Sequence, residues 1–222
     1  MTLNSHESLD LVELSYKNKV NLMVGHVLLF HPAIQKIKQM ISSGLIGNMQ
    51  YIYSNRLNLG RLRKEENVFW SLAPHDISVL QYLIDDFPAN ITTTGGIFLQ
   101  DGIHDTTLTI LEYPNNIKAH IYLSWLHPFK EHRIVIIGSK GMISFEDSLT
   151  DKPLKYYNKK YIKNGSEFTI DDGNVQLIEY EQYSPLEQEL KYFINHLSSS
   201  IKISNGNNAL EVIKILELAS NS

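Results

Sequence analysis

The sequence predicts an α+β fold, with a mainly antiparallel open sheet, helices packed on one face of it, and an opening helix and strand before it. Three observations carry this prediction. Short alternating segments follow one another from Met49 onward, turn residues separate them, and stretches with helical spacing lie before, between and after them. The 222 residues are enough for one large domain, or for a domain with a remnant of another.

The first thirty residues are predicted to form a helix and a buried strand. Residues 5–19 have helical spacing of apolar residues, and Ser5 is the candidate N-cap because its hydroxyl can accept an amide hydrogen bond. Residues 20–30 form an apolar run without alternation, which favours a strand covered on both faces, as in a parallel sheet. Nothing in these thirty residues covers both faces, so we expect the end of a parallel α/β unit whose beginning is absent.

The elements that follow are predicted in order. A second helix starts at His31-Pro32 and closes at Gly44. Strands are predicted at residues 49–59, 90–98, 106–113, 117–125, 133–137 and 142–145, where polar and apolar residues alternate. Helices are predicted at residues 74–84, 184–197 and 207–219. Residues 158–183 are polar and weakly patterned, so we expect a long loop there.

Composition excludes several classes of function. Hydrophobic residues make up 43% and charged residues 20% of the chain, as is typical of globular proteins. The net charge of −4 disfavours a nucleic-acid binder. The absence of cysteine excludes disulfides, zinc–thiolate sites, iron–sulfur clusters and cysteine nucleophiles. No leader pattern and no long uncharged apolar run occur, so the prediction is a soluble, cytoplasmic protein without a membrane partner.

One predicted strand face is rich in anion-binding groups. Arg56 and Asn58 share a parity in the strand at residues 49–59, and Arg61 and Arg63 follow Gly60. Guanidinium groups match phosphate oxygens bidentately, so these four residues are candidates for binding a phosphorylated ligand. Arg61 and Arg63 are also compatible with solvated loop charges, and Arg56 and Asn58 are the better candidates.

A titratable pair follows in the chain. Residues 71–74, Ser-Leu-Ala-Pro, have the pattern of a helix start and would place His75 and Asp76 in the first turn. A helix N-terminus disfavours imidazolium, which would keep His75 neutral, whereas Asp76 would counteract that effect. Anion-binding donors beside this histidine indicate a polar-ligand site. The alternative is a solvated strand face followed by a histidine that only caps the helix.

Eight short motifs, in order along almost the whole chain, resemble the Gfo/Idh/MocA oxidoreductases, and among them the nucleotide-sugar dehydrogenases. The combination is far more specific than any single motif. The motifs are Leu22-Met-Val-Gly-His26, Phe30-His31-Pro32, Asn55-Arg-Leu-Asn-Leu-Gly60, Trp70 with Ala73-Pro-His-Asp-Ile77, Ser124-Trp-Leu-His-Pro128, Gly138-Ser-Lys-Gly141, Pro185-Leu186 and Asn205-Gly206.

The resemblance implies a division of the chain. Members of the family have an N-terminal Rossmann domain that binds NAD or NADP and a C-terminal α+β domain whose sheet also builds oligomers. Residues 1–30 would be a remnant of the Rossmann domain, and residues 31–222 the substrate and oligomerisation domain. None of the 12 glycines forms G-x-G-x-x-G, and the family's Glu-Lys-Pro motif, with its catalytic lysine, would lie before Met1. We therefore expect no tight dinucleotide binding by this chain alone.

The resemblance also implies roles for single residues. His75 matches the active-site histidine on the helix that faces the nicotinamide, and neutral imidazole is a suitable base for a secondary alcohol. Ser71 stands where many members carry an aspartate one turn earlier, so the proton relay differs. His26 would lie near the nicotinamide, although Leu29 replaces an arginine found in many members.

The remaining candidates are weaker. Trp70 and Trp125 are candidates for stacking on a sugar, and core packing is the commoner role of such residues. His127 is a further candidate for substrate binding. Residues 101–105, Asp-Gly-Ile-His-Asp, superficially suggest a metal cluster, but a hairpin turn fits better because ligands normally converge from separate elements. No metal site is predicted.

Two classes of function remain open. The first is the substrate-binding and oligomerisation portion of an NAD(P)-dependent oxidoreductase acting on a sugar or nucleotide-sugar hydroxyl, inactive alone and completed by upstream residues or a separate Rossmann-containing chain. The second is a non-catalytic binding or assembly module from a truncated gene. A variant of the first, nucleotide-sugar binding without turnover, would depend on Arg56 and not on His75. A homo-oligomer through the sheet is expected in each case.

Overall fold

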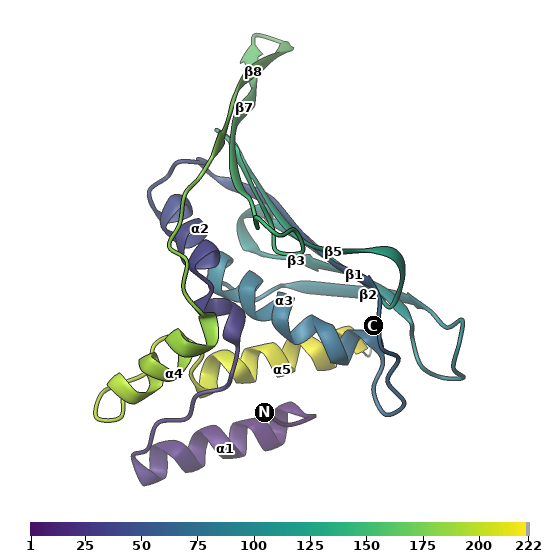
Figure 1. Ribbon diagram of the computed structural model, residues 1–222, viewed down its shortest axis with the longest axis vertical. Helices are drawn as coiled ribbons and strands as arrows, with labels where there is room; N and C mark the ends of the chain where they lie inside the picture. Colours follow the sequence, from purple (N-terminus) through teal and green to yellow (C-terminus); the bar gives the residue numbers. More distant parts are fainter. Residues whose placement is uncertain (221–222) are drawn as a thin grey trace.

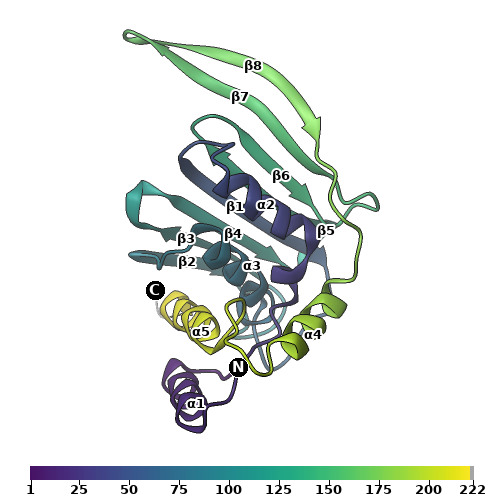
Figure 2. The same cartoon turned by 90° about the vertical axis from the view of Figure 1, so that its left-hand side faces the viewer.

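An eight-stranded sheet forms one layer of the structure, and helices form the other (Figures 1 and 2). The computed structural model describes residues 1–220. The strands are β1 (Met49–Leu59), β2 (Asn90–Gly96), β3 (Thr106–Glu112), β4 (Lys118–Ser124), β5 (Leu126–Gly138), β6 (Met142–Glu146), β7 (Leu154–Asn164) and β8 (Glu167–Leu177). The helices are α1 (Ser5–Asn18), α2 (Pro32–Ser42), α3 (Val68–Ile84), α4 (Pro185–Asn195) and α5 (Gly206–Ser220), with 3₁₀ turns η1 (Val27–Phe30) and η2 (Pro114–Asn116).

The strand order is β2-β3-β4-β1-β5-β6-β7-β8, so β1 lies in the middle of the sheet. Only β1 and β4 run parallel, and every other neighbouring pair is antiparallel. The register places Arg56 of β1 opposite His132 of β5. This topology confirms the predicted α+β fold with a mainly antiparallel open sheet.

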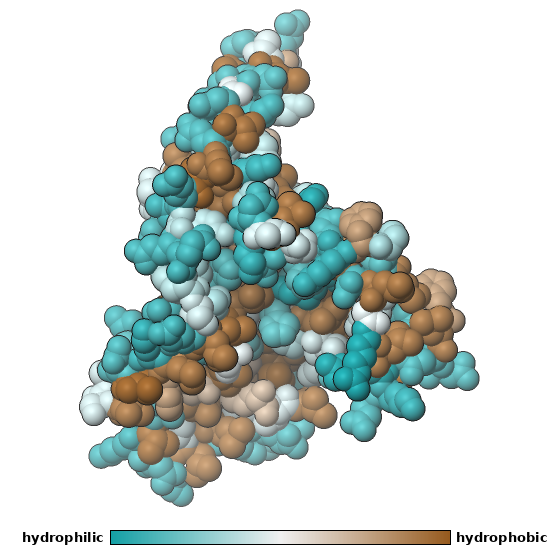
Figure 3. Space-filling model, in the orientation of Figure 1, coloured by the Kyte–Doolittle hydropathy of each residue, from teal (hydrophilic) through white to brown (hydrophobic). Residues whose placement is uncertain are grey.

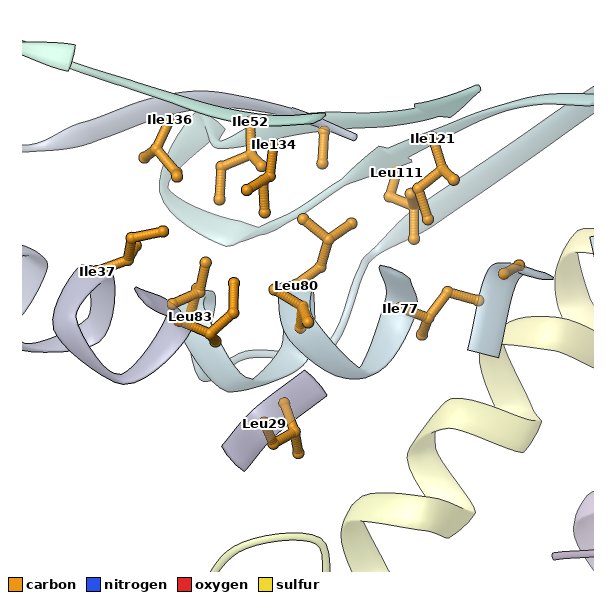
Figure 4. Close-up of a cluster of buried hydrophobic side chains, with 14 of the residues drawn as sticks. Leu29, Ile37, Ile52, Ile77, Leu80, Leu83, Leu111, Ile121, Ile134 and Ile136 are labelled. Carbon is orange, nitrogen blue, oxygen red and sulfur yellow. The ribbon is translucent and has the colours of Figure 1, made fainter. Parts of the chain in front are cut away.

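The core fills the space between the sheet and the helices. Figure 4 shows Ile52, Ile134 and Leu111 pointing from the strands toward Leu80 and Ile77 on α3. Both α3 side chains are fully buried, as is Ile37 on α2. Burial of each such side chain contributes roughly 1.5–3 kcal/mol, so this one interface holds α3 against β1. All described helices lie on this side, and the opposite face of the sheet, here called the open face, carries none (Figure 2).

The opening segment differs from the prediction. Helix α1 forms as expected, but Asn4 caps it and accepts a hydrogen bond from the backbone N–H of Glu7 at 2.8 Å. The strand predicted at residues 20–30 is wrong, because only Met23 makes a β-bridge, to Asn205, and η1 follows. Apolar residues alone do not make a strand, and the described residues offer no neighbouring strand to pair with this run. The segment instead packs beside α5.

A second difference concerns the predicted loop at residues 158–183, which is wrong over most of its length. Strands β7 and β8 form a long hairpin there, with the turn at Gly165 in the left-handed region (φ 66°). Cross-strand ion pairs join Lys159 to Asp172 at 2.5 Å and Lys160 to Asp171 at 3.3 Å. The segment looked polar because Lys–Asp pairs face each other across the two strands.

Helices and strands elsewhere agree with the prediction within a few residues, except that β5 and α3 are longer. Helices α4 and α5 close the chain, and Ser184 caps α4, as the pattern at residues 184–197 indicates. Within residues 1–220 no helix combines the length and the apolar character needed to cross a bilayer.

Candidate active site

Helix α3 carries His75 and Asp76 at its middle and not at its start. Asn67 caps the helix, since its side chain accepts a hydrogen bond from the backbone N–H of Trp70 at 3.0 Å. The helix then continues through Pro74. The predicted helix start at residue 74 is therefore wrong, and so is the argument that the helix N-terminus keeps His75 neutral. A proline can occur inside a helix where tertiary packing outweighs its local cost.

A buried ion pair links α3 to β1. The Nε of Arg56 lies 2.8 Å from one carboxylate oxygen of Asp76, and its Nη2 lies 3.2 Å from the other. The hydroxyl of Ser54 donates a third hydrogen bond to Asp76 at 2.7 Å. The Asp76 side chain is 4% exposed and that of Arg56 is 14% exposed. Both Asp76 oxygens are thus occupied, and the Arg56 guanidinium is held in a fixed plane.

His75 lies beside this pair, half-buried on α3. Burial lowers the pKa of its imidazole, the charge of Arg56 lowers it further, and Asp76 partly opposes both effects. The imidazole of His75 therefore remains neutral without help from a helix terminus. A neutral imidazole can accept a proton, which is the property that a base near pH 7 needs.

Two further imidazoles lie close to these residues, His26 near His75 and His132 near Arg56. Burial and the neighbouring His75 lower the pKa of His26 to about 4, and its Nε2 has no hydrogen-bond partner among the described residues. Burial lowers the pKa of His132 to about 4, with Arg56 and Lys130 adding to the shift. The sequence did not single out His132, because only the register between β1 and β5 brings it to Arg56.

A small cavity of about 30 Å³ opens between the ion pair and the neighbouring strand. Apolar side chains such as Val79 supply part of its lining, and the polar part comes from Ser54, Asn55, Arg56, Asp76, His132, Arg133 and Asp147. A cavity needs about 10–15 Å³ to hold one water molecule, and this lining offers enough polar partners for one. The cavity beside Arg56 can therefore hold a water molecule but not a sugar.

Comparisons with known proteins identify the family of the chain. The model of the GFO/IDH/MocA C-terminal domain matches residues 34–144, which is half of the chain. The chain belongs to the Gfo/Idh/MocA family. The match includes β1 and α3, so the Arg56–Asp76 pair and His75 lie within the family domain.

Two curated relatives cover similar parts of the Gfo/Idh/MocA chain. An uncharacterized oxidoreductase from Streptococcus pneumoniae is 26% identical over 66% of this chain and 44% of the relative. The 2,7-anhydro-N-acetylneuraminate hydratase from Escherichia coli is 24% identical over 66% of this chain and 43% of the relative. The chain thus covers less than half the length of the curated relatives that it matches.

Solved structures share the fold over nearly the whole chain. The UDP-N-acetylglucosamine 3-dehydrogenase GnnA from Acidithiobacillus ferrooxidans superposes with a TM-score of 0.84 at 19% identity, covering 98% of this chain and 67% of that one. An oxidoreductase from Agrobacterium radiobacter in complex with NAD+, L-tartaric acid and magnesium superposes with a TM-score of 0.75 at 18% identity, covering 99% and 67%. Family neighbours therefore include oxidoreductases that use nicotinamide cofactors.

The other predicted site residues of the Gfo/Idh/MocA domain lie in different places. Asn58 is half-buried on β1, two residues beyond Arg56. Arg61 and Arg63 lie after β1, together with Trp70, around an open depression of about 970 Å³. Arg63 approaches Glu66 at 3.7 Å, which fits the solvated-charge alternative for that residue. These residues form a second polar region near the N-terminal end of α3.

The remaining aromatic candidates lie apart from the ion pair. Trp125 is 3% exposed and belongs to the hydrophobic core, so its ring offers no face for stacking on a sugar. Trp70 is half-buried, and its indole donates a hydrogen bond to Ser220 at 3.0 Å. His127 packs edge-on against Phe129, with ring centroids 4.4 Å apart. Residues 101–105 form the predicted turn, and the described residues 1–220 hold no cluster of three or more potential metal ligands.

Proposed function

We propose that this chain is the substrate-binding and self-associating portion of an NAD(P)-dependent oxidoreductase that acts on a sugar or nucleotide-sugar hydroxyl. One observation carries the proposal: His75 lies in a desolvated position beside an arginine that a buried carboxylate holds in place. The family and the printed activity of the Acidithiobacillus ferrooxidans enzyme support the substrate class.

In this proposal, His75 accepts the proton of the substrate hydroxyl. Its neutral form at pH 7 supports this role, because imidazolium has no free acceptor nitrogen. Arg56 orients the substrate through the guanidinium edge that Asp76 leaves uncovered, since the ion pair uses Nε and Nη2 and leaves Nη1. Asp76 acts as a positioning residue. Asn58, Arg61, Arg63 and Trp70 are proposed to contact more distant parts of the substrate.

The start of α1 does not fit the pyrophosphate of a dinucleotide. The amide groups at the start of α1 are already engaged, because Asn4 caps it and Glu217 accepts a hydrogen bond from the backbone N–H of Ser5 at 2.9 Å. A carboxylate at this position repels a pyrophosphate, and the sequence has no G-x-G-x-x-G turn. We propose that residues beyond these 222, or a separate chain, hold the NAD(P).

Calorimetric titration of the 222-residue protein tests the proposal. We expect weak binding of UDP-N-acetylglucosamine and no tight binding of NADH. Arg56→Lys keeps the charge and loses the planar fork, so it should weaken sugar-nucleotide binding at least about tenfold. Arg133→Lys is the matched control, because it makes the same change in an arginine that pairs with Glu146 and not with Asp76. Low-micromolar NADH affinity, or equal binding by wild type and Arg56→Lys, would contradict the proposal.

The open face supports the self-association. On β3 the apolar Leu108 and Ile110 point outward, 37% and 44% exposed, whereas Thr107 and Thr109 are buried. This is the reverse of the pattern expected for a sheet face in water. The eight strands are separated by seven spacings of ~4.8 Å. Without the projecting part of the β7–β8 hairpin (residues 159–172) they average about seven residues at ~3.4 Å, so this face measures roughly 800 Å², the area that each partner of a stable dimer buries.

Sedimentation equilibrium tests this second part. Ile110→Lys introduces a charge on the open face and should shift the protein toward monomer by at least about tenfold in the dissociation constant. Leu14→Lys on α1 is the control, since Leu14 is 54% exposed and belongs to the helical layer. A wild-type protein that stays monomeric at millimolar concentration would refute the self-association.

A non-catalytic assembly module is the second candidate, and the outward-facing apolar residues of β3 favour it equally. The two candidates differ in sugar-nucleotide binding. An assembly module binds no sugar nucleotide at any concentration, whereas the oxidoreductase portion binds it through the Arg56 side of α3.

A further inference from the structure

The far end of the β7–β8 hairpin projects beyond the rest of the molecule (top of Figure 1). We call residues 159–172, past the irregularity in the hairpin, the arm. Its strands pair with each other, and the ribbon shows no helix over either side of it (Figures 1 and 2). An isolated two-stranded hairpin is marginally stable in water. An arm that extends this far therefore needs a source of stability outside itself.

One side of the arm is apolar. Tyr161 and Ile170 are directly opposite each other, and Phe168 is diagonal to them on the same side. Their exposed fractions are 68%, 68% and 64%, and the rings of Tyr161 and Phe168 meet edge-on with centroids 6.5 Å apart. Brown side chains along the upper part of the space-filling view mark apolar residues there (Figure 3). These three residues are called the arm cluster.

The arm cluster continues the open face. On β7, Leu154 and Tyr156 are buried against the helices, so Lys155 and Tyr157 face the open side. The extra residue of the hairpin irregularity lies on β8, between the partners of Tyr157 and Lys159. Alternation along β7 is therefore unbroken, and Tyr161 falls on the same side as Tyr157. The open face and the arm cluster make one continuous surface.

The free edge of β8 is a poor site for adding a strand. A Cβ atom at Gly173 would lie 1.9 Å from the carbonyl oxygen of Asn158, so this position admits only glycine and the edge is bent there. Asp171 and Asp172 add charge beside it. Bulges and charges are the features that protect edge strands from pairing. A partner of the arm therefore binds through the apolar side and not through the edge.

We propose that the arm cluster docks on a second copy of this chain and extends the interface formed by the open face. This inference rests on the self-association proposed above. The open face measures roughly 800 Å², which equals but does not exceed the area that each partner of a stable complex buries. The arm cluster would add apolar contact area to this interface. In a two-fold dimer both arms make the same contact, so each residue of the cluster counts twice.

The same substitution on the two sides of the arm tests the inference in the full 222-residue protein. Ile170→Thr removes apolar surface from the arm cluster, and Ile162→Thr does so on the opposite side, where Ile162 is 42% exposed. Threonine keeps the β-branched shape that strands favour, so the hairpin itself is preserved. Phe168→Thr is a second variant on the cluster side.

Sedimentation equilibrium should show an about tenfold or larger rise in the dimer dissociation constant for Ile170→Thr and Phe168→Thr, and less than about threefold for Ile162→Thr. Thermal unfolding, measured at a concentration where each variant is monomeric, should be the same for all three. Equal dissociation constants in Ile170→Thr and Ile162→Thr, while Ile110→Lys still dissociates the dimer, would overturn the role of the arm and leave the open face intact. A monomeric wild type would overturn both. Equal weakening together with lower melting temperatures would assign the arm to hairpin stability and overturn its docking role.

Discussion

Replacing Asp76 by asparagine tests the central ion pair directly. Asparagine has the same shape as aspartate but lacks the charge, so the side chain still fits between β1 and α3. The Arg56 guanidinium then stays buried with a neutral partner in place of a carboxylate, and Ser54 loses its charged acceptor. The loss of stability therefore measures the free-energy cost of leaving the buried Arg56 cation without a counter-ion.

The magnitude follows from burial. Removing one partner of a fully buried ion pair costs about 3–5 kcal/mol. Arg56 is 14% exposed and retains some contact with water, so we expect a loss near the lower end, about 3 kcal/mol. For a domain of this size each kcal/mol lowers the melting temperature by about 2–4 °C, so Asp76→Asn should melt about 6–12 °C below wild type.

Urea unfolding followed by circular dichroism gives the free energy, and a thermal scan gives the melting temperature. Asp172→Asn is the matched control, since the Lys159–Asp172 pair is 37% and 74% exposed and should contribute less than about 1 kcal/mol. Adding Arg56→Met to Asp76→Asn removes the buried charge and should restore most of the loss. A loss below about 1 kcal/mol in Asp76→Asn alone would refute the reasoning.

Three further predictions concern buried side chains. Leu80→Ala should cost about 2–5 kcal/mol in urea unfolding, because Leu80 is fully buried at the centre of the core, and a cost under 1 kcal/mol would argue against that placement. Burial raises the pKa of the Glu189 carboxyl, so wild type loses stability as the pH rises through the ordinary glutamate range. Glu189→Gln should therefore melt at a higher temperature than wild type at pH 7 and at the same temperature below pH ~4. Burial lowers the pKa of His26 to about 4, so His26 alone should contribute about 3 kcal/mol to the stability that wild type loses as the pH falls from ~6.5 to ~4, and His132 adds to that loss. His26→Asn should remove much of that acid sensitivity, and His6→Asn, at an 86% exposed position, should leave it unchanged.

Local patterns predicted most of the fold because the deciding interactions there are local. The alternation at residues 49–59 matches β1, and the helical spacing at residues 207–219 matches α5 within one residue at each end. The strand predicted at residues 20–30 was wrong because a strand needs a neighbouring strand, and an apolar run alone does not show that one is present. The loop predicted at residues 158–183 was wrong because the residues that face each other across the hairpin are known only once its register is known.

The candidate site divides in the same way. The sequence indicated Arg56 and His75 through their local patterns, and the structure brings them together with Asp76. The sequence offered Trp125 as a candidate for stacking on a sugar, with core packing as the commoner role, and the side chain lies in the core, because the residue type alone does not determine its burial. His132 was missed because its proximity to Arg56 depends on the pairing of strands separated by more than seventy residues.

Burial lowers the pKa of every histidine in the site, and the charge of Arg56 adds to the shift for two of them. Arg56 stays charged at every physiological pH, and its charge lowers the pKa of both His75 on α3 and His132 on β5. His75 in turn lowers the pKa of His26. Asp76 fixes the guanidinium in place, but it only partly opposes the effect on His75, because burial outweighs the attraction of the carboxylate. The packing of α3 on β1 therefore lowers the pKa of His75. The helix N-terminus that the sequence pattern suggested does not contribute to this shift.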